Sequence, residues 1–411
     1  MTEIPASATT SGPAPVTAPR TRRRAWIAGL EGPRGLAAIC VVVVHVAAVH
    51  TPWIVDATRI DFLGQALTFF FVLSGFLLYL PYVIRAADGK TSPPVGRYFL
   101  NRVRRVFPAY LVIFLLVNFV LRASYTSNPV TLGWDRVTDG TGIITDPARL
   151  LAHLTLTQSY FPSTLQTGIN PAWSLTTEWG FYLVLPIAGW LLFRSVGRRP
   201  LAVALVPAGV MVGVGLLSTT VVGVLQGRSD LPALEQFWGA NWYAVLSRSF
   251  LPFADTFGWG MAAAVVYAAL VHGAWSDVST QRVQVLFGAA TVAFLGASIA
   301  VFLLDLRYTA SVFAVAAACF ILTIVAPLGR GEPSPLASVT DWTPLRFIGM
   351  ISLSSYLWHY PVIIVLERWG LPVPPTVIGL IWGSVVVLAV TFALGATSYF
   401  LIERPAMRWR T

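Results

Sequence analysis

The hydrophobic positions of the chain fall into long runs that short polar stretches separate. Ten runs have the length and the low charge of a helix that crosses a lipid bilayer, which takes about 20 mostly apolar residues. The predicted spans cover residues 35–53, 62–84, 106–122, 172–193, 201–222, 252–272, 284–304, 309–328, 346–367 and 375–402. The pattern therefore predicts an all-α, polytopic membrane protein, a bundle of about ten transmembrane helices.

Composition supports this fold class and sets one segment apart. The chain is 56% hydrophobic and 11% charged, with a mean hydropathy of +0.70, whereas soluble domains are about half apolar and a quarter charged. Residues 1–25 are instead rich in Pro, Ala, Ser and Thr and lack an apolar period, which predicts a disordered cytosolic tail. The three arginines before the first span resemble the start of a signal sequence, but without a convincing cleavage site they introduce an uncleaved first helix.

The basic residues orient the predicted bundle. A net charge of +10 would suggest nucleic acid as the partner of a soluble protein, but here most Lys and Arg residues flank apolar runs. With both termini in the cytosol, 20 of the 28 Lys and Arg residues lie on the inner side, as the positive-inside rule requires. We expect a multi-pass protein of the plasma (inner) membrane whose environment is the lipid bilayer, and no nucleic-acid partner.

Two predicted outer loops are long, at about residues 123–171 and 223–251. The first contains "LLAHLTLTQSY", which is too short to span a bilayer and is expected to lie at the interface or to re-enter the protein. Cys40 and Cys319 both lie inside predicted spans, so they are interpreted as packing residues, and no metal site is expected.

Arg34, His45 and Glu178 are the first candidates for chemistry, because ionisable side chains inside a membrane are costly and usually functional. His45 follows Arg34 by eleven residues, which places it about 16 Å deeper along a helix, where a neutral imidazole suits a general base. Glu178 belongs to the same half of the bilayer. We therefore expect Glu178 to pair with His45 and orient its ring, as in a catalytic triad; hydrogen bonds or salt bridges to other groups are the structural alternatives.

Arginines gather before the third span, in "RYFLNRVRRVFPAYL", with Arg102 and Arg105 beside the membrane. They are either ordinary positive-inside charge or a grip for the phosphates of a cytosolic ligand, because guanidinium groups bind phosphate oxygens in a bidentate way.

Two further spans carry polar residues. In the ninth, "SLSSYLWHYPVI" places Tyr356 and His359 in an apolar helix, where they either line a cavity or hydrogen-bond to other helices. In the second, "FVLSGFLL" predicts close helix packing around Ser74 and Gly75.

Six segments taken together resemble the acyltransferase-3 family of integral membrane acyltransferases. They are "GLEGPRGLAAICVVVVHV", "FFVLSGFLL", "RVRRVFPAY", "NPAWSLTTEWGFYLVLP", "SSYLWHYPVI" and "SYFLIERPAMR". Arg34 and His45 match the family's basic residue and histidine of the first helix. Arg102, Arg105 and Pro108 match its R-x-x-R-x-x-P, and Trp173, Ser174, Leu175 and Glu178 match its W-S-L-x-x-E. The likeness runs in order from about residue 26, which predicts one acyltransferase-3 transmembrane domain over residues 26–411.

The resemblance implies a ten-helix bundle that moves an acyl group from a cytosolic acyl-CoA, acetyl-CoA above all, to a hydroxyl of a carbohydrate or a lipid-linked glycan. Acyl-CoA is then a co-substrate, and no permanently bound cofactor is expected. The residues carried over are catalytic His45 and Glu178, acyl-CoA-binding Arg34, Arg102 and Arg105, and substrate-binding Asn170, Trp173, Tyr356 and His359.

The expected acceptor is a glycolipid or glycan of a bacterial cell envelope, a trehalose mycolate type of glycolipid included; a secondary metabolite is another acceptor that fits. Since the sequence stops after the tenth predicted helix, we expect direct transfer to the acceptor or to a separate envelope-biogenesis partner protein. The alternative function is a proton-coupled transporter or flippase of a glycolipid, in which His45 and Glu178 form a proton relay.

Overall fold

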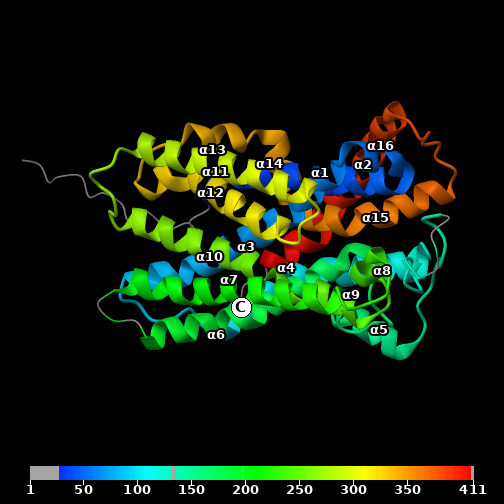
Figure 1. Cartoon of the computed structure of the whole chain (residues 1–411), viewed down its shortest axis with the longest axis horizontal. Coiled ribbons are helices and arrows are strands. Elements are labelled where there is room, and N and C mark those ends of the chain that lie inside the picture. The colour runs from blue at the N-terminus through cyan, green and yellow to red at the C-terminus, as the bar shows by residue number, and fades with distance from the viewer. Residues whose placement is uncertain (1–26, 132, 134–135, 196, 198, 409–411) are drawn as a thin grey trace, which may run out of the picture.

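The structure is a computed structural model that describes residues 27–131, 133, 136–195, 197 and 199–408; the predicted tail at 1–25 lies outside them. Ten long helices form the bundle (Figure 1): α1 (Glu31–His50), α3 (Ala66–Ala87), α4 (Val95–Leu115), α6 (Trp173–Ser195), α7 (Pro200–Gln226), α10 (Phe250–Val271), α11 (Thr280–Leu303), α12 (Thr309–Gly329), α15 (Ser352–Arg368) and α16 (Val377–Ser398). Shorter elements connect or extend them: α2 (Pro52–Thr58), η1 (Ile60–Gln65), η2 (Leu116–Val120), β1 (Ser124–Tyr125), β2 (Thr141–Gly142), α5 (Pro147–Leu154), η3 (Gln158–Tyr160), η4 (Asn170–Ala172), α8 (Ala233–Trp238), α9 (Trp242–Arg248), α13 (Pro335–Thr340), α14 (Thr343–Met350), η5 (Tyr399–Glu403) and α17 (Arg404–Arg408).

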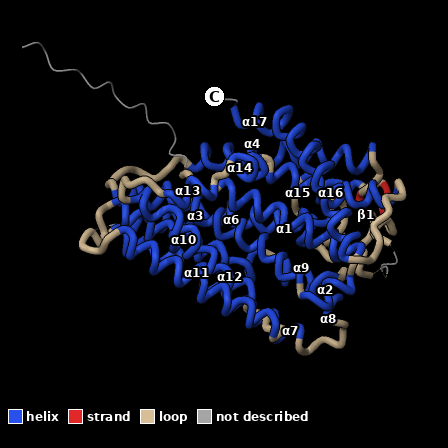
Figure 2. Tube along the Cα trace, turned by 90° about the horizontal axis from the view of Figure 1, so that it is seen from above, coloured by secondary structure: helices blue, strands red, loops and turns tan. Residues whose placement is uncertain are grey.

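The predicted all-α bundle of about ten apolar helices is confirmed. In the part of the chain that the structure describes, nine helical stretches are long and apolar enough to cross a membrane, and one bent pair of helices makes a tenth. Figure 2 places α11 and α7 along one edge of the bundle. In the most apolar stretch of each helix, only 6% of the residues of α11 and 28% of those of α7 are buried inside the protein. These two helices therefore present most of their surface to lipid.

The ninth predicted span is wrong in one respect, since residues 346–367 do not form one helix. The chain breaks after Met350, and α14 meets α15 at an angle of 76°. Close backbone contact explains the crossing of α14 over the start of α1: a Cβ on Gly349 would lie 1.9 Å from the carbonyl oxygen of Glu31, and one on Gly35 would lie 2.1 Å from that of Leu345. Side chains larger than glycine would push α14 away, so the bend and the glycines belong together.

The third predicted span begins too late. The helix starts at Val95 rather than near residue 106, so Arg102 and Arg105 lie within α4 and not in a loop before it. Apolar pattern alone misses this stretch because it is rich in polar residues, two of which, Arg102 and Arg105, face a cavity described below. At its other end α4 continues into the π-helical turn η2, where the buried Asn118 side chain exchanges hydrogen bonds of 2.8 and 3.1 Å with the backbone of Ile144.

The first long loop is a folded cap at the far end of α4. The strands β1 and β2 pair antiparallel, and α5 contains part of the segment for which an interfacial or re-entrant position was expected. His153 of α5 is fully buried, stacks on Phe114 with ring centroids 5.1 Å apart, and lies with its Nε2 3.0 Å from the Thr167 hydroxyl. That hydroxyl donates to Thr164, so His153 Nε2 is the donor of the pair and Nδ1 is the unprotonated nitrogen.

His153 should make the stability of the cap depend on pH. Burial, with a smaller contribution from the charge of Arg149, lowers the pKa of His153 from 6.5 to about 4. Between pH 6.5 and pH 4 the unfolded chain binds a proton at His153 and the folded chain does not. The contribution of His153 to the free energy of unfolding is therefore full above pH 6.5 and is lost as the pH falls toward 4. We expect thermal unfolding in detergent to report a loss of about 2 kcal/mol from this residue between pH 7 and pH 5. His153→Gln should flatten that part of the profile; an unchanged pH slope would contradict the assignment.

Candidate active site

Arg34 and His45 share one face of α1. Their spacing of eleven residues is about three turns of helix, so both side chains point the same way, toward α15. The Arg34 guanidinium is held at the start of the helix by an ion pair with Glu31, 3.0 Å long, and donates to the Ser352 hydroxyl at 3.2 Å. The bend between α14 and α15 is what brings Ser352 to this position.

A cavity of about 340 Å³ opens beside Arg34. Five helices and α17 supply its walls, with apolar residues mostly from α3 and polar residues mostly from the other long helices. The polar residues that line it are Arg34, Ser74, Arg102, Arg105, Ser174, Glu178, Tyr182, Ser352 and Tyr356.

The three arginines gather at the end of this cavity that α17 borders, and they differ in their partners. Arg105 forms a 2.7 Å ion pair with Glu403, whose carboxylate is fully buried and also accepts from the Ser354 hydroxyl at 2.9 Å. Arg102 has a buried Nε that finds no hydrogen-bond acceptor among the described residues, and its guanidinium lies 5.8 Å from the ring centre of Tyr182. Arg102 is therefore better placed to bind an incoming anion, whereas Arg105 holds helices together.

Further along the cavity, Ser174, Glu178 and Tyr182 follow one another at the four-residue spacing of a single face of α6. Glu178 accepts a hydrogen bond from Ser74 of α3 at 2.7 Å. The hydroxyls of Ser174 and Tyr356 lie 2.6 Å apart, and Tyr356 also donates to the carbonyl of Pro171 at 2.7 Å. These contacts close the cavity at the end opposite the arginines.

His45 lies beyond Tyr356, next to His359. The two imidazole rings have centroids 4.9 Å apart, and the ring of Tyr360 stands edge-on to His45 at 5.5 Å. Nδ1 of His45 is 2.7 Å from the carbonyl oxygen of Val41. Since a carbonyl only accepts, Nδ1 carries the proton and Nε2 keeps its lone pair.

The expected pairing of His45 with Glu178 is absent from the contacts of the described residues. Glu178 faces the cavity and Ser74, while the carbonyl of Val41 orients His45. Position in the same half of a bilayer could not reveal this, because helix packing decides which faces meet. The catalytic roles predicted for the two residues stay predictions.

Two predicted substrate-binding residues lie outside the cavity. Trp173 is 7% exposed, and its ring packs against Trp238, Phe253 and the guanidinium of Arg248. Asn170 donates over a long 3.4 Å to the backbone of Gln166. The other two, Tyr356 and His359, lie at the end of the cavity and just beyond it.

Sequence reasoning missed several residues of the site, among them Ser74, Ser174 and Glu403, and also Tyr182 and Ser352 of the cavity wall. Ser74 was assigned to helix packing; its neighbour Gly75 does pack closely, since a Cβ there would lie 2.2 Å from the carbonyl oxygen of Phe257, but Ser74 itself faces Glu178. Ser174 and Glu403 were quoted only as parts of motifs. The available signal was a polar residue inside an otherwise apolar run.

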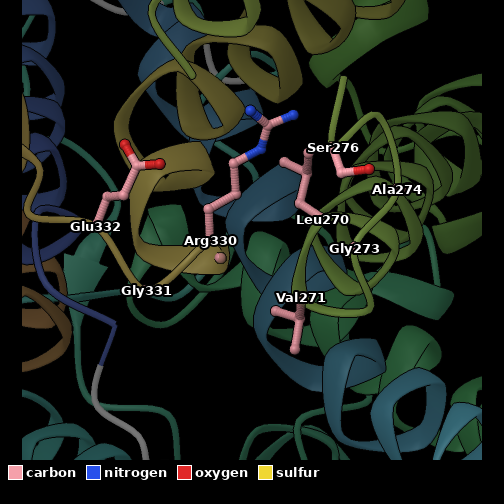
Figure 3. Close-up of a pocket in the computed structure, with 9 residues that line it drawn as sticks. Leu270, Val271, Gly273, Ala274, Ser276, Arg330, Gly331 and Glu332 are labelled. Atoms are coloured by element: carbon pink, nitrogen blue, oxygen red, sulfur yellow. The ribbon is translucent and has the colours of Figure 1, made fainter. Parts of the chain in front are cut away.

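A larger cavity of about 500 Å³ lies between the turn after α10 and the turn after α12 (Figure 3). Its arginine, Arg330, donates to the carbonyls of Trp275 and Val278 and to the hydroxyl of Thr280, and Thr280 in turn donates to Glu332. These polar groups are used to join the two turns, so the smaller cavity beside Arg34 is the better candidate. Among the described residues, no group of three His, Cys, Asp or Glu side chains is placed to hold a metal ion.

Comparison with known families identifies the family of this chain. The model of the "Acyltransferase domain" family matches residues 27–399. The chain belongs to the acyltransferase-3 family. All the polar residues named above that line the cavity lie within the matched region, and Glu403 follows it. No solved structure matches the chain.

Three curated relatives are about a quarter identical to this acyltransferase-3 chain over the aligned residues. YrhL of Bacillus subtilis (strain 168) is 26% identical over 407 residues, and the "Peptidoglycan O-acetyltransferase OatA" of Listeria monocytogenes serovar 1/2a is 26% identical over 400; each alignment covers 94% of this chain. The chain spans only 56% and 57% of the length of these two relatives. The "Acyltransferase MdmB" of Streptomyces mycarofaciens is 25% identical over 399 residues, 92% of this chain and 91% of MdmB.

The ion pair of Arg105 with Glu403 should be needed for the fold. Arg105→Gln leaves a buried carboxylate without its counter-charge, which typically costs about 3 kcal/mol or more. We expect a lower thermal unfolding temperature in detergent, and a recovery of most of the loss in the double variant Arg105→Gln/Glu403→Gln. Equal stabilities of Arg105→Gln and the unmodified protein would show that Glu403 does not depend on the pair.

Proposed function

We propose that the chain is a membrane O-acyltransferase that moves an acetyl or other short acyl group from acyl-CoA to a hydroxyl of a cell-envelope glycan or glycolipid. The observation that carries the proposal is one cavity lined by three arginines, by Glu178 and by the hydroxyls of Ser174 and Tyr356, with His359 and then His45 just beyond Tyr356. Family membership supports acyl transfer, and the names of OatA and MdmB describe an O-acetyltransferase and an acyltransferase.

Acyl-CoA fits the arginine end of the cavity. A volume of about 340 Å³ is at the low end for small-molecule sites, so it suits the acyl group and the pantetheine arm, with the nucleotide left outside. Arg102 would grip a phosphate at the mouth, and Arg34 would lie along the arm. The positive-inside rule favours a cytosolic position for this end, the side on which acyl-CoA would be available.

The acceptor would meet the thioester from the other side, near His45. Because Nδ1 of His45 is bound to Val41, its Nε2 is the nitrogen that can remove the hydroxyl proton. The acceptor oxygen then bonds to the thioester carbon, the carbon–sulfur bond breaks, and the proton passes to the departing thiolate. Glu178, which faces the cavity, would act on the substrate directly rather than through His45.

The name of OatA favours a glycan hydroxyl as the acceptor, and a glycolipid, such as one of the trehalose mycolate type, fits the same chemistry. The setting we propose is the plasma membrane of a bacterium, with acyl-CoA and the acceptor as partners. A separate envelope-biogenesis protein would be the recipient if the acyl group is handed on.

Loss of His45 should abolish transfer. We expect detergent-purified protein to release free thiol from acetyl-CoA when an envelope lipid and glycan extract is supplied, and His45→Ala to slow this release at least about 100-fold, the usual contribution of a general base. His50→Gln is the matched control, because His50 ends the same helix, pairs with Glu367 at 3.7 Å and does not line the cavity.

Full activity of a folded His45→Ala protein would remove His45 from the mechanism. If the protein moves glycolipid across vesicle membranes but releases no thiol from acetyl-CoA or longer acyl-CoAs, the transporter function would be supported instead of the enzyme.

Loss of Arg102 should weaken the binding of the acyl donor and leave the rate of the transfer step unchanged. Arg102→Gln removes a charge-assisted contact to phosphate, and we expect the KM for acetyl-CoA to rise about tenfold, or about 1.4 kcal/mol, with kcat little changed. Arg97→Gln is the control, since Arg97 is an exposed arginine of α4 that does not line the cavity. An unchanged KM for Arg102→Gln would place the phosphates elsewhere.

A further inference from the structure

His359 stands between the cavity and His45. Along α15, Tyr356 lines the cavity and His359 follows one turn later; their rings lie 5.4 Å apart. The ring of His359 is in turn 4.9 Å from that of His45. His359 therefore lies between Tyr356, in the cavity wall, and His45.

The two histidines are held in the same way. Nδ1 of His359 lies 2.5 Å from the carbonyl oxygen of Tyr356, as Nδ1 of His45 lies 2.7 Å from that of Val41. Each ring thus has its Nδ1 proton bound to its own helix and its Nε2 lone pair free. Neither ring can turn over without breaking this bond, so the two Nε2 atoms keep fixed directions.

His359 has an unpaired nitrogen beside a second imidazole. The side chain is fully buried, yet Nε2 finds no hydrogen-bond partner among the described residues, and an unpaired buried nitrogen costs free energy. The buried His153 of the cap also leaves a nitrogen, Nδ1, unpaired, but it packs against Phe114, whereas His359 lies between the ring of His45 and a residue of the cavity wall. A lone pair kept open beside a second imidazole is instead ready to take a proton.

We propose that His359 is a second proton-carrying residue, which works with His45 in the transfer reaction. The inference rests on the proposed function. Nε2 of His45 takes the proton of the acceptor hydroxyl as the oxygen bonds to the thioester carbon. The proton passes to Nε2 of His359 through a hydroxyl or a water between the rings, and then to the thiolate that leaves when the carbon–sulfur bond breaks. Both imidazoles end neutral, and free thiol and ester are the only products.

The test compares two variants of His359 in the full chain, with acetyl-CoA and the envelope extract as probes. His359→Gln keeps most of the volume and a hydrogen-bond acceptor but cannot carry a proton, and His359→Ala leaves room for added imidazole. We expect kcat to fall about 100-fold in both, with the KM for acetyl-CoA within twofold of its original value, and added imidazole to restore the rate of His359→Ala at least tenfold.

His272→Gln is the matched control. His272 makes the same kind of bond to its own helix, 2.8 Å from the carbonyl of Ala268, but its other nitrogen pairs with Asp88 at 3.2 Å, so its activity should not change.

Three results would overturn the proposal while leaving acyl transfer in place. They are a normal kcat in His359→Gln, a loss in His359→Ala that imidazole does not restore, and a change confined to the KM for acetyl-CoA. If His359→Ala fails to fold, the kcat of His359→Gln decides alone. Absence of thiol release from the unmodified protein is a different result, because it rejects the proposed function itself.

Discussion

The walls of the cavity depend on one buried carboxylate. Glu403 ends the π-helical turn η5 with no exposure, and it is reached by Arg105 from α4 and Ser354 from α15. These contacts fix the last helix of the chain against two helices that line the cavity. A carboxylate buried without compensation would cost several kcal/mol, so the three elements must meet for any of them to be stable in place. The position of Tyr356, two residues after Ser354, follows from this arrangement.

The sequence predicted the helices well because lipid imposes a simple rule. Backbone groups in hydrocarbon must pair within the helix, and apolar runs of sufficient length report this directly. The shared face of Arg34 and His45 could also be predicted, since both lie on a single helix and eleven residues make about three turns. The contact of Ser74 with Glu178 could not be predicted, because it depends on how α3 packs against α6.

Contacts between helices were beyond the sequence. Depth in the membrane put Glu178 level with His45, but the structure pairs Glu178 with Ser74 and His45 with His359. The bend at Ile351 was hidden because α14 and α15 together have the length and hydropathy of one span. The early start of α4 could not be predicted because the stretch is polar. Arg102 and Arg105 are typical of a loop by sequence, and only the folded structure shows the cavity that they face. Each error concerns a neighbour that only the folded chain supplies.

The bend between α14 and α15 shortens the helix that crosses the membrane beside the site. At 1.5 Å per residue, the 17 residues of α15 extend about 25 Å, whereas the hydrocarbon core of a bilayer is about 30 Å thick. Because α14 turns aside at Met350, α15 alone is shorter than the hydrocarbon core. A polar molecule bound beside Ser352, at the start of α15, would therefore lie within the thickness of the bilayer and have a shorter distance to cover to a reactant on the opposite side.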